Sequence, residues 1–117
     1  MSSAPTKPFV AQHSIPAGVT STRWWWVRHA PVREDGGNIY GQYDIGCDCS
    51  DTVVFDGVAK FLPRSALWFS SNLKRTHQTA AAIWEAGFPK PDQMFQDKAF
   101  AEQDLGEWQG MNRAAFF

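Results

Sequence analysis

Arg28 and His29 are the first residues of this chain whose types and position favour chemistry at a site. They follow directly on an apolar Trp-Trp-Trp-Val run at residues 24–27, and Pro31 prevents regular extended structure from continuing. The run predicts a buried strand that delivers Arg28 and His29 to its carboxyl end. In open α/β sheets, ligands bind outside the carboxyl ends of the strands, so this cation and imidazole would face the bound ligand. An isolated Arg-His pair, by contrast, would be only a strand cap and a surface histidine.

Arg75 is the second candidate, because its surroundings favour an anion. The sequence predicts a helix that begins after Ser71 or Asn72 as N-cap and runs to about residue 86, where a glycine and a proline end it. Arg75 and Thr79 are four apart and share one face near the helix N-terminus, where free N–H groups and the dipole favour an anion. An arginine there suits a phosphate. His77 points away from that face, so we interpret it as a surface or packing histidine.

A third segment, residues 100–110, is an acidic loop, which in most proteins would be a solvated turn. In their order and spacing, the three segments resemble the histidine phosphatase superfamily, also called phosphoglycerate mutase-like. Its members carry a strand ending in Arg-His-Gly, a Ser-x-Leu-x-Arg helix start followed by Thr-Ala, and a Glu-(three residues)-Gly-x-Trp-x-Gly loop. The counterparts here are residues 28–30, 71–80 and 102–110. The resemblance covers about residues 24–111 and implies a three-layer α/β/α fold with a mostly parallel sheet.

The resemblance also implies a phosphohistidine mechanism. His29 lies at the position of the family's nucleophile and would attack phosphorus through one ring nitrogen, with the other nitrogen held by a backbone carbonyl. Glu102 coincides with the family's acid; it would protonate the leaving oxygen and then activate the hydrolytic water. The residues expected to bind the phosphate are Arg28, Arg75, Asn38 and Gly41. No metal or other cofactor is required.

The segment at residues 31–50 is rich in Gly and Asp and predicts an active-site loop. Its Pro-Val after the histidine motif and its Tyr40-Gly41-Gln42-x-Asp44 element look closest to α-ribazole phosphatases and their relatives, although an Ile-Gly pair replaces their usual Pro-Leu. Asp35 stands where many members of the family carry an asparagine that touches the phosphate. Either Asn38 takes that role through a shifted loop, or the contact is lost.

The family's second histidine has no counterpart here. Members carry it in their C-terminal half, and neither His13 in the leader nor His77 can serve. The family fold also takes strands from that half, so the chain is expected to leave an apolar strand edge uncovered. We therefore expect residues 23–117 to be the N-terminal portion of a histidine phosphatase domain, incomplete at the C-terminus. Residues 1–22, rich in Pro, Ser, Thr and Ala and without an apolar h-region, predict a flexible leader.

The leading interpretation is a metal-independent phosphomonoesterase for a small phosphorylated metabolite, of the α-ribazole phosphate or sugar phosphate kind. A phosphoglycerate mutase is the weaker alternative, because mutases usually show additional basic residues and the loop after His29 offers only Arg33. The rival from another class is a non-catalytic phosphate-binding or interaction module, or an inactive fragment, since the second histidine is absent. Nucleic-acid binding through the tryptophans would need a basic groove that the composition denies, so we expect the three tryptophans at residues 24–26 to be core.

Composition narrows the class and the partners. The chain has 117 residues, a mass of 13.1 kDa, a net charge of -1 and a pI near 6.3, which favours one domain with a small ligand and neither nucleic acid nor membrane as partner. A mean hydropathy of -0.37 and the lack of an apolar run of ~20 residues exclude a transmembrane helix. Cys47 and Cys49 flank Asp48, a spacing unsuited to an ordinary disulfide framework, and we interpret them as free thiols in a reducing cytoplasm.

The remaining elements are predicted from periodicity and capping. Apolar positions at helical spacing predict a packing helix over residues 51–62, with Asp51 or Ser50 as N-cap and Pro63 at its end. The apolar run at residues 66–69 predicts a second strand, paired in parallel with the first through a right-handed crossover. A further short strand is predicted around residues 93–95.

Overall fold

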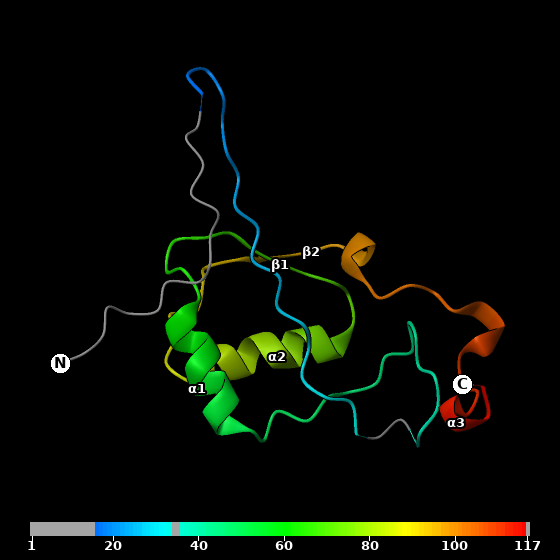
Figure 1. Ribbon diagram of the computed structural model, residues 1–117. Coiled ribbons are helices and arrows are strands. Elements are labelled where there is room, and N and C mark those ends of the chain that lie inside the picture. Colours follow the sequence, from blue (N-terminus) through cyan, green and yellow to red (C-terminus); the bar gives the residue numbers. More distant parts are fainter. Residues whose placement is uncertain (1–15, 34–35, 117) are drawn as a thin grey trace.

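Residues 16–33 and 36–116 are described by the computed structural model of the chain (Figure 1). Its elements follow in this order: α1 (Thr52–Phe61), β1 (Trp68–Ser70), α2 (Lys74–Glu85), β2 (Met94–Gln96), the short 3-10 helices η1 (Lys98–Phe100) and η2 (Gly106–Trp108), and α3 (Arg113–Phe116). Asp35 and residues 1–15 of the predicted leader lie outside the described residues. Within the described ranges, no helix has the length and apolar character needed to cross a membrane.

Helix α1 confirms the prediction from capping and periodicity. The Asp51 carboxylate accepts a hydrogen bond from the backbone N–H of Val54 at 3.3 Å, which satisfies one of the free donors of the first turn. Leu62 is already extended, and Pro63 follows it. The helix buries Phe55 and Ala59 against α2, whereas Val54 and Phe61 of the apolar stripe that predicted it are 54% and 50% exposed, so the helix is as predicted but its packed face is not.

Helix α2 begins later than predicted. Its first residue is Lys74, and its N-cap is Leu73, which offers no capping side chain. The predicted cap at Ser71 or Asn72 is therefore wrong: Ser71 Oγ accepts from the N–H of Leu73 at 3.2 Å, and Ser71 lies two residues before the N-cap position. The helix N–H of Lys74 instead donates to the Asp44 carboxylate at 2.7 Å, so a residue from a distant loop supplies the anion that this helix end favours.

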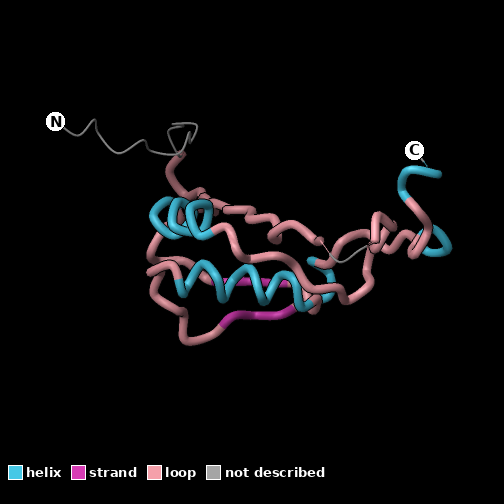
Figure 2. The backbone as a smooth tube through the Cα atoms, turned by 90° about the horizontal axis from the view of Figure 1, so that it is seen from below, coloured by secondary structure: helices cyan, strands magenta, loops and turns pink. Residues whose placement is uncertain are grey.

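Strands β1 and β2 form a two-stranded parallel sheet with α2 as the connection between them. Trp68 pairs with Met94, and Ser70 pairs with Gln96. Seen from below in Figure 2, α2 lies in front of the two strands. The parallel α/β architecture is as predicted, and the short strand expected around residues 93–95 is β2.

The predicted strand at residues 24–27 is wrong, and so is its pairing with β1. This segment has no regular structure, although it runs extended beside β1. A strand needs ladder hydrogen bonds to a neighbour, which an apolar run by itself does not supply. Contact is made by rings instead: Trp24 stacks on Trp26 at 5.9 Å between ring centroids and lies 6.4 Å from Phe69. β1 pairs with β2 on the described part of the chain.

The core lies on one face of the sheet, between α1 and α2. Its buried residues are Ala30, Phe55, Ala59, Leu62, Ile83 and Phe88, with Trp68 of β1 packed against them. Phe69 and Phe95 point from the other face and are 45% and 38% exposed. The prediction concerned an uncovered strand edge; the partly exposed apolar surface seen here is instead this second face of the sheet, where Trp24 and Phe100 lie 6.4 and 6.0 Å from Phe69.

The tryptophans divide between core and surface. Trp25 is half-buried, packs against the core, and meets Phe61 edge-on at 5.6 Å. Trp24 and Trp26 are 59% and 77% exposed. The expectation that all three are core is thus wrong for two of them, because in extended chain neighbouring side chains point to opposite sides and only Trp25 points toward the helices.

Candidate active site

His29 is held in one orientation and one tautomer. Its Nδ1 lies 2.7 Å from the carbonyl oxygen of Ala30. A carbonyl can only accept, so Nδ1 carries the proton and Nε2 is left with a free lone pair. The backbone beside it is fastened to α2, because the N–H of Ala30 donates to Thr79 Oγ1 at 2.9 Å. The side chain is 11% exposed, so the free nitrogen is sheltered yet reachable.

Glu102 and Arg75 complete the centre of the site. Arg75 Nη2 donates to Glu102 Oε2 at 3.0 Å, and His29 Nε2 lies 3.9 Å from the same oxygen. One carboxylate oxygen is therefore positioned between the guanidinium and the imidazole. The Glu102 side chain is 40% exposed, so solvent or a ligand can reach its carboxylate. The Arg75 side chain is 1% exposed and lies buried beneath it.

Arg75 is buried, and backbone carbonyls fix its position. Its Nη1 donates to the carbonyl of Tyr43 and its Nη2 to the carbonyl of Gly41, both at 2.7 Å. The ring of Tyr40 lies 4.9 Å from the guanidinium carbon. Its Nε–H is buried and has no hydrogen-bond partner among the described residues. A buried donor without a partner is costly, and an anionic oxygen placed against it would remove that cost.

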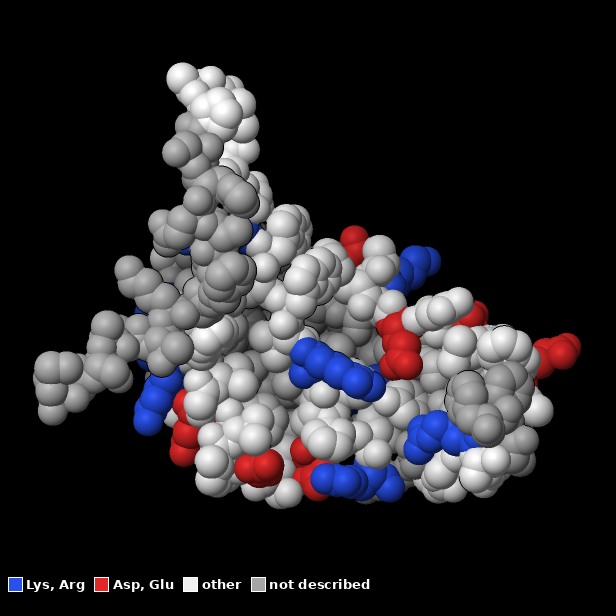
Figure 3. Space-filling view, viewed as in Figure 1, with Lys and Arg blue, Asp and Glu red and all other residues white. Residues whose placement is uncertain are grey.

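A pocket of about 380 Å³ joins these groups. Its lining contains four of the six predicted site residues, Arg28, His29, Arg75 and Glu102; the others are Val27, Ser71, Leu73, Thr76 and Phe100. Within the described part of the chain, the exposed guanidinium of Arg28 has no hydrogen-bond or ion-pair partner. Basic and acidic side chains alternate on the face drawn in Figure 3, so the positive charge available to an anion is local to the pocket.

The other two predicted residues lie outside this pocket. Asn38 forms an isolated antiparallel bridge with Asn112, and its carbonyl accepts from Arg113 Nη1 at 3.0 Å. Gly41 is buried with φ +50°, its carbonyl is bound by Arg75, and the side chain of Gln109 packs directly on it. In this structure Gly41 supports an arginine of the site, and Asn38 holds the loop to the C-terminal segment.

Sequence reasoning missed two contributors, Tyr40 and Asp44. The Tyr40 ring contacts both groups: it lies 4.9 Å from the Arg75 guanidinium carbon and meets the His29 imidazole edge-on at 6.3 Å. Asp44 fixes the first turn of α2, from which Arg75 projects. Both belong to the Tyr-Gly-Gln-x-Asp element of the loop, so the signal was present, but only as a family likeness without an assigned role.

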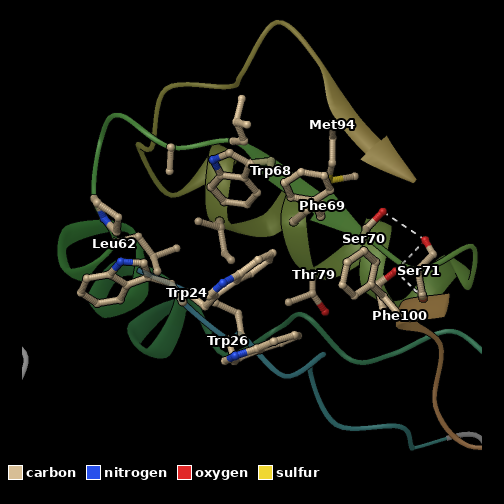
Figure 4. Close-up of a pocket in the computed structure, with 18 of the residues that line it drawn as sticks. Trp24, Trp26, Leu62, Trp68, Phe69, Ser70, Ser71, Thr79, Met94 and Phe100 are labelled. Atoms are coloured by element: carbon tan, nitrogen blue, oxygen red, sulfur yellow. Dashed lines mark hydrogen bonds between the residues drawn. The ribbon is translucent and has the colours of Figure 1, made fainter. Parts of the chain in front are cut away.

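A larger cavity, of about 760 Å³, lies beside the pocket and has a different character. It is lined by the segment at residues 24–27, β1 and part of α2, and its walls include the rings of Trp24, Trp26, Trp68, Phe69 and Phe100 (Figure 4). The polar groups drawn at its edge, Ser70 and Ser71, bond to one another. It offers no cluster of cationic donors, so the smaller pocket is the one suited to an anion.

Comparison with known proteins follows this geometry. The model of the histidine phosphatase superfamily (branch 1) matches residues 24–116. The solved structure of a mycobacterial glucosyl-3-phosphoglycerate phosphatase is 27% identical, with a TM-score of 0.56 over 75% of this chain and 41% of that one. Mycobacterial hydrolase 1 is 26% identical, with a TM-score of 0.59 over 75% of this chain and 42% of that one. The same phosphatase in complex with VO3 is 27% identical, with a TM-score of 0.56 over 74% and 43%.

The chain thus spans about two fifths of the length of these solved structures. Among curated proteins, none matches it significantly in sequence.

Proposed function

Because this chain belongs to the histidine phosphatase superfamily (branch 1), we propose that it supplies the nucleophile and the phosphate-binding pocket of a metal-independent phosphomonoesterase. The observation that carries the proposal is the arrangement around one carboxylate oxygen. Glu102 Oε2 lies 3.9 Å from the free nitrogen of His29 and 3.0 Å from Arg75. Nucleophile, proton donor and cation then line one pocket of about 380 Å³, a size suited to a small metabolite.

The proposed reaction has two steps, both on phosphorus. In the first, His29 Nε2 attacks, the P–O bond to the leaving group breaks, and Glu102 gives its proton to the departing alkoxide. In the second, Glu102, now a carboxylate, takes a proton from water, whose oxygen attacks phosphorus and releases His29. Arg28 and the unpartnered Nε–H of Arg75 would bind the phosphoryl oxygens as negative charge moves between them. The Nδ1 contact to Ala30 keeps Nε2 as the attacking nitrogen throughout.

For the substrate, we infer a phosphorylated sugar or a related small phosphomonoester. Two solved neighbours are described as a glucosyl-3-phosphoglycerate phosphatase, which acts on a sugar-bearing phosphate, and the loop element at residues 40–44 resembles α-ribazole phosphatases. Both point to a polar metabolite that carries one phosphate. We place the protein in the cytoplasm, because its two cysteines are free thiols.

Phosphate binding without turnover is the second candidate. It is favoured by one observation: His29 is the only histidine that lines the pocket on the described residues. Turnover in this superfamily is expected to use a second histidine as a hydrogen-bond donor to the phosphoryl group, whereas Arg28 and Arg75 would bind an anion without it.

The test is hydrolysis of p-nitrophenyl phosphate, together with intact mass after incubation with acetyl phosphate. Wild-type protein should turn over in the presence of a chelator and gain one acid-labile phosphoryl group, and His29→Ala should do neither. The matched control is His77→Ala, because His77 only bonds the carbonyl of Ser71 at 3.0 Å and should leave both readouts intact. Phosphate binding by calorimetry with no covalent adduct would establish the second candidate. If the protein neither binds phosphate nor forms a covalent adduct, both candidate functions are wrong.

A further inference from the structure

Cys47 and Cys49 lie in contact in a place that the proposed reaction does not use. Their sulfur atoms are 3.6 Å apart, both thiols are free, and both side chains are half-buried. They are the two cysteines of the chain. A disulfide has an S–S distance of about 2.05 Å, so closing the pair needs a movement of roughly 1.5 Å rather than a refolding of the loop. Any intramolecular disulfide of this chain must join these two.

The surroundings of Cys47 connect the pair to the site. Its Sγ donates to the carbonyl of Arg75 at 3.3 Å and lies 3.5 Å from Thr79 Oγ1. Its N–H donates to the side chain of Gln78 at 2.9 Å. Thr79 Oγ1 is also the group that accepts from the N–H of Ala30, next to His29. The thiol is thus packed against the one hydroxyl that fastens the His29 segment to α2.

The neighbouring residue adds a second link. The N–H of Asp48 donates to the carbonyl of Pro31 at 2.7 Å, so the backbone between the two cysteines is bonded to the chain two residues after His29. A change in the geometry of residues 47–49 is therefore transmitted both to α2 and to the loop that follows the nucleophile.

We propose that Cys47 and Cys49 form a reversible redox modification site, at which a low-molecular-weight disulfide such as glutathione disulfide converts the pair into an internal disulfide. Closing the disulfide draws the sulfur of Cys47 away from Arg75 and Thr79. It also removes the S–H group that donates a hydrogen bond to the Arg75 carbonyl in the reduced protein. The contact between Thr79 and Ala30 then loses its packing partner. The effect on His29 rests on the proposed function; formation of the disulfide does not.

The exchange balances in two steps. The Cys47 thiolate attacks one sulfur of glutathione disulfide, forming a mixed disulfide and releasing one glutathione thiolate, which takes up the proton lost by Cys47. Cys49 then gives up its proton and attacks the Cys47 sulfur, which releases the second glutathione as a thiol. Two protein thiols are oxidised, and one small disulfide is reduced to two thiols. Cys47 acts first because burial, followed by the Cys47 thiol and the charges of Asp48 and Glu85, raises the pKa of Cys49 to about 11.

The close spacing of the two cysteines sets how easily their disulfide is reduced. A disulfide across one intervening residue closes a very small ring, and strained disulfides are the readily reduced, labile ones. The pair would stay reduced in an ordinary reducing cytoplasm and close only when the glutathione pool becomes oxidised.

The test treats the full chain with glutathione disulfide and then counts reactive thiols and measures intact mass. The wild type should go from two reactive thiols to none and lose the mass of two hydrogen atoms, with both changes reversed by dithiothreitol. Cys49→Ser should instead retain one bound glutathione, because no second thiol resolves the mixed disulfide. Stable glutathione adducts on the wild type, or two thiols that persist in fully oxidised buffer, would overturn the proposal.

The link to the site has its own readout, the backbone amide signal of Ala30 in a nitrogen-proton NMR spectrum. Oxidation should shift this signal in the wild type and leave it in place in the double variant Cys47→Ser/Cys49→Ser, which has no thiol to modify. If the disulfide forms and the Ala30 signal does not move, the coupling is wrong although the modification site stands. Neither measurement depends on phosphatase activity, so failure of the proposed function would leave both results interpretable.

Discussion

Arg75 and Glu102 are joined by a contact of 3.0 Å, yet one lies inside the protein and the other at its surface: their side chains are 1% and 40% exposed. The arginine also donates to the carbonyls of Gly41 and Tyr43, so its position does not depend on the carboxylate. Glu102, by contrast, is fixed mainly by the arginine. The pair therefore combines a rigid structural cation with an acid that remains available for proton transfer.

This asymmetry predicts unequal effects on stability. Arg75→Ala leaves two carbonyls without their donor and should lower the free energy of unfolding by about 2–4 kcal/mol. Arg75→Lys keeps the charge but lacks the planar fork that reaches both carbonyls, so it should lose a substantial part of the same amount. Glu102→Gln should change it by less than about 1 kcal/mol, because Glu102 is 40% exposed, an amide oxygen can still accept from Arg75, and the arginine keeps both carbonyl acceptors. Urea unfolding measures all three, and a Glu102→Gln loss as large as that of Arg75→Ala would contradict the asymmetry.

Gly41 is expected to tolerate no side chain. Its φ is +50°, where residues other than glycine are strained, and a Cβ would collide with the side chain of Gln109. Gly41→Ala should destabilise the protein by about 1–3 kcal/mol. The matched control is Gly57→Ala in the middle of α1, where nothing lies near the added methyl group and a gain of about 0.5–1 kcal/mol is expected. Thermal unfolding of the two variants should shift in opposite directions; shifts of the same sign would refute the local argument.

Thr79 is expected to matter through its hydroxyl rather than its volume. That hydroxyl accepts from the buried N–H of Ala30 at 2.9 Å and donates to the carbonyl of Arg75 at 2.8 Å. Thr79→Val keeps the shape but leaves the amide unsatisfied, which should cost about 1–3 kcal/mol, whereas Thr79→Ser keeps the bond and should cost about 1 kcal/mol or less. Hydrogen exchange at the Ala30 amide should be faster in the Thr79→Val variant than in the wild type, and unchanged in the Thr79→Ser variant. Equal exchange rates would show that the bond does not hold this segment.

Local signals predicted local structure well. Helix α1 was predictable because its cap, Asp51, and its apolar stripe lie within one short segment. The face shared by Arg75 and Thr79 followed from helical spacing in the same way. These features depend on residues a few positions apart, whose geometry the helix itself dictates.

Features that depend on distant residues were not predictable. The run at residues 24–27 has strand composition, but pairing is decided by a neighbour, and the described chain gives it ring contacts with Phe69 and Phe100 instead. The capping of α2 by Asp44, 30 residues away, likewise has no local signature. The convergence of His29, Arg75 and Glu102 was expected from a family likeness, and spacing alone would not have predicted it.

In the reduced protein, the Cys49 thiol should be alkylated more slowly near neutral pH than an ordinary thiol, and faster as pH rises. Burial, then the neighbouring Cys47 thiol and the charges of Asp48 and Glu85, raise its pKa from 9.0 to about 11. A raised pKa means that the folded protein holds this proton more tightly, so the associated stability is full below pH 9 and is lost as pH rises toward 11. In Cys47→Ser, where the effect of Cys47 is gone but burial remains, alkylation by iodoacetamide should still rise with a midpoint above that of the protein in urea. Coincident midpoints would show that Cys49 is not shielded.

Neighbouring tryptophans should respond differently to truncation. Trp25 packs against the core and against Phe61, so Trp25→Ala should lower the free energy of unfolding by about 2 kcal/mol or more. Trp26 is 77% exposed, and its ring contacts are with Trp24 at 5.9 Å and Phe100 at 6.4 Å, so Trp26→Ala should cost about 1 kcal/mol or less. Urea unfolding followed by far-UV circular dichroism compares the two without relying on tryptophan fluorescence. A larger loss for Trp26 than for Trp25 would contradict this assignment of Trp25 to the core side and Trp26 to the surface side.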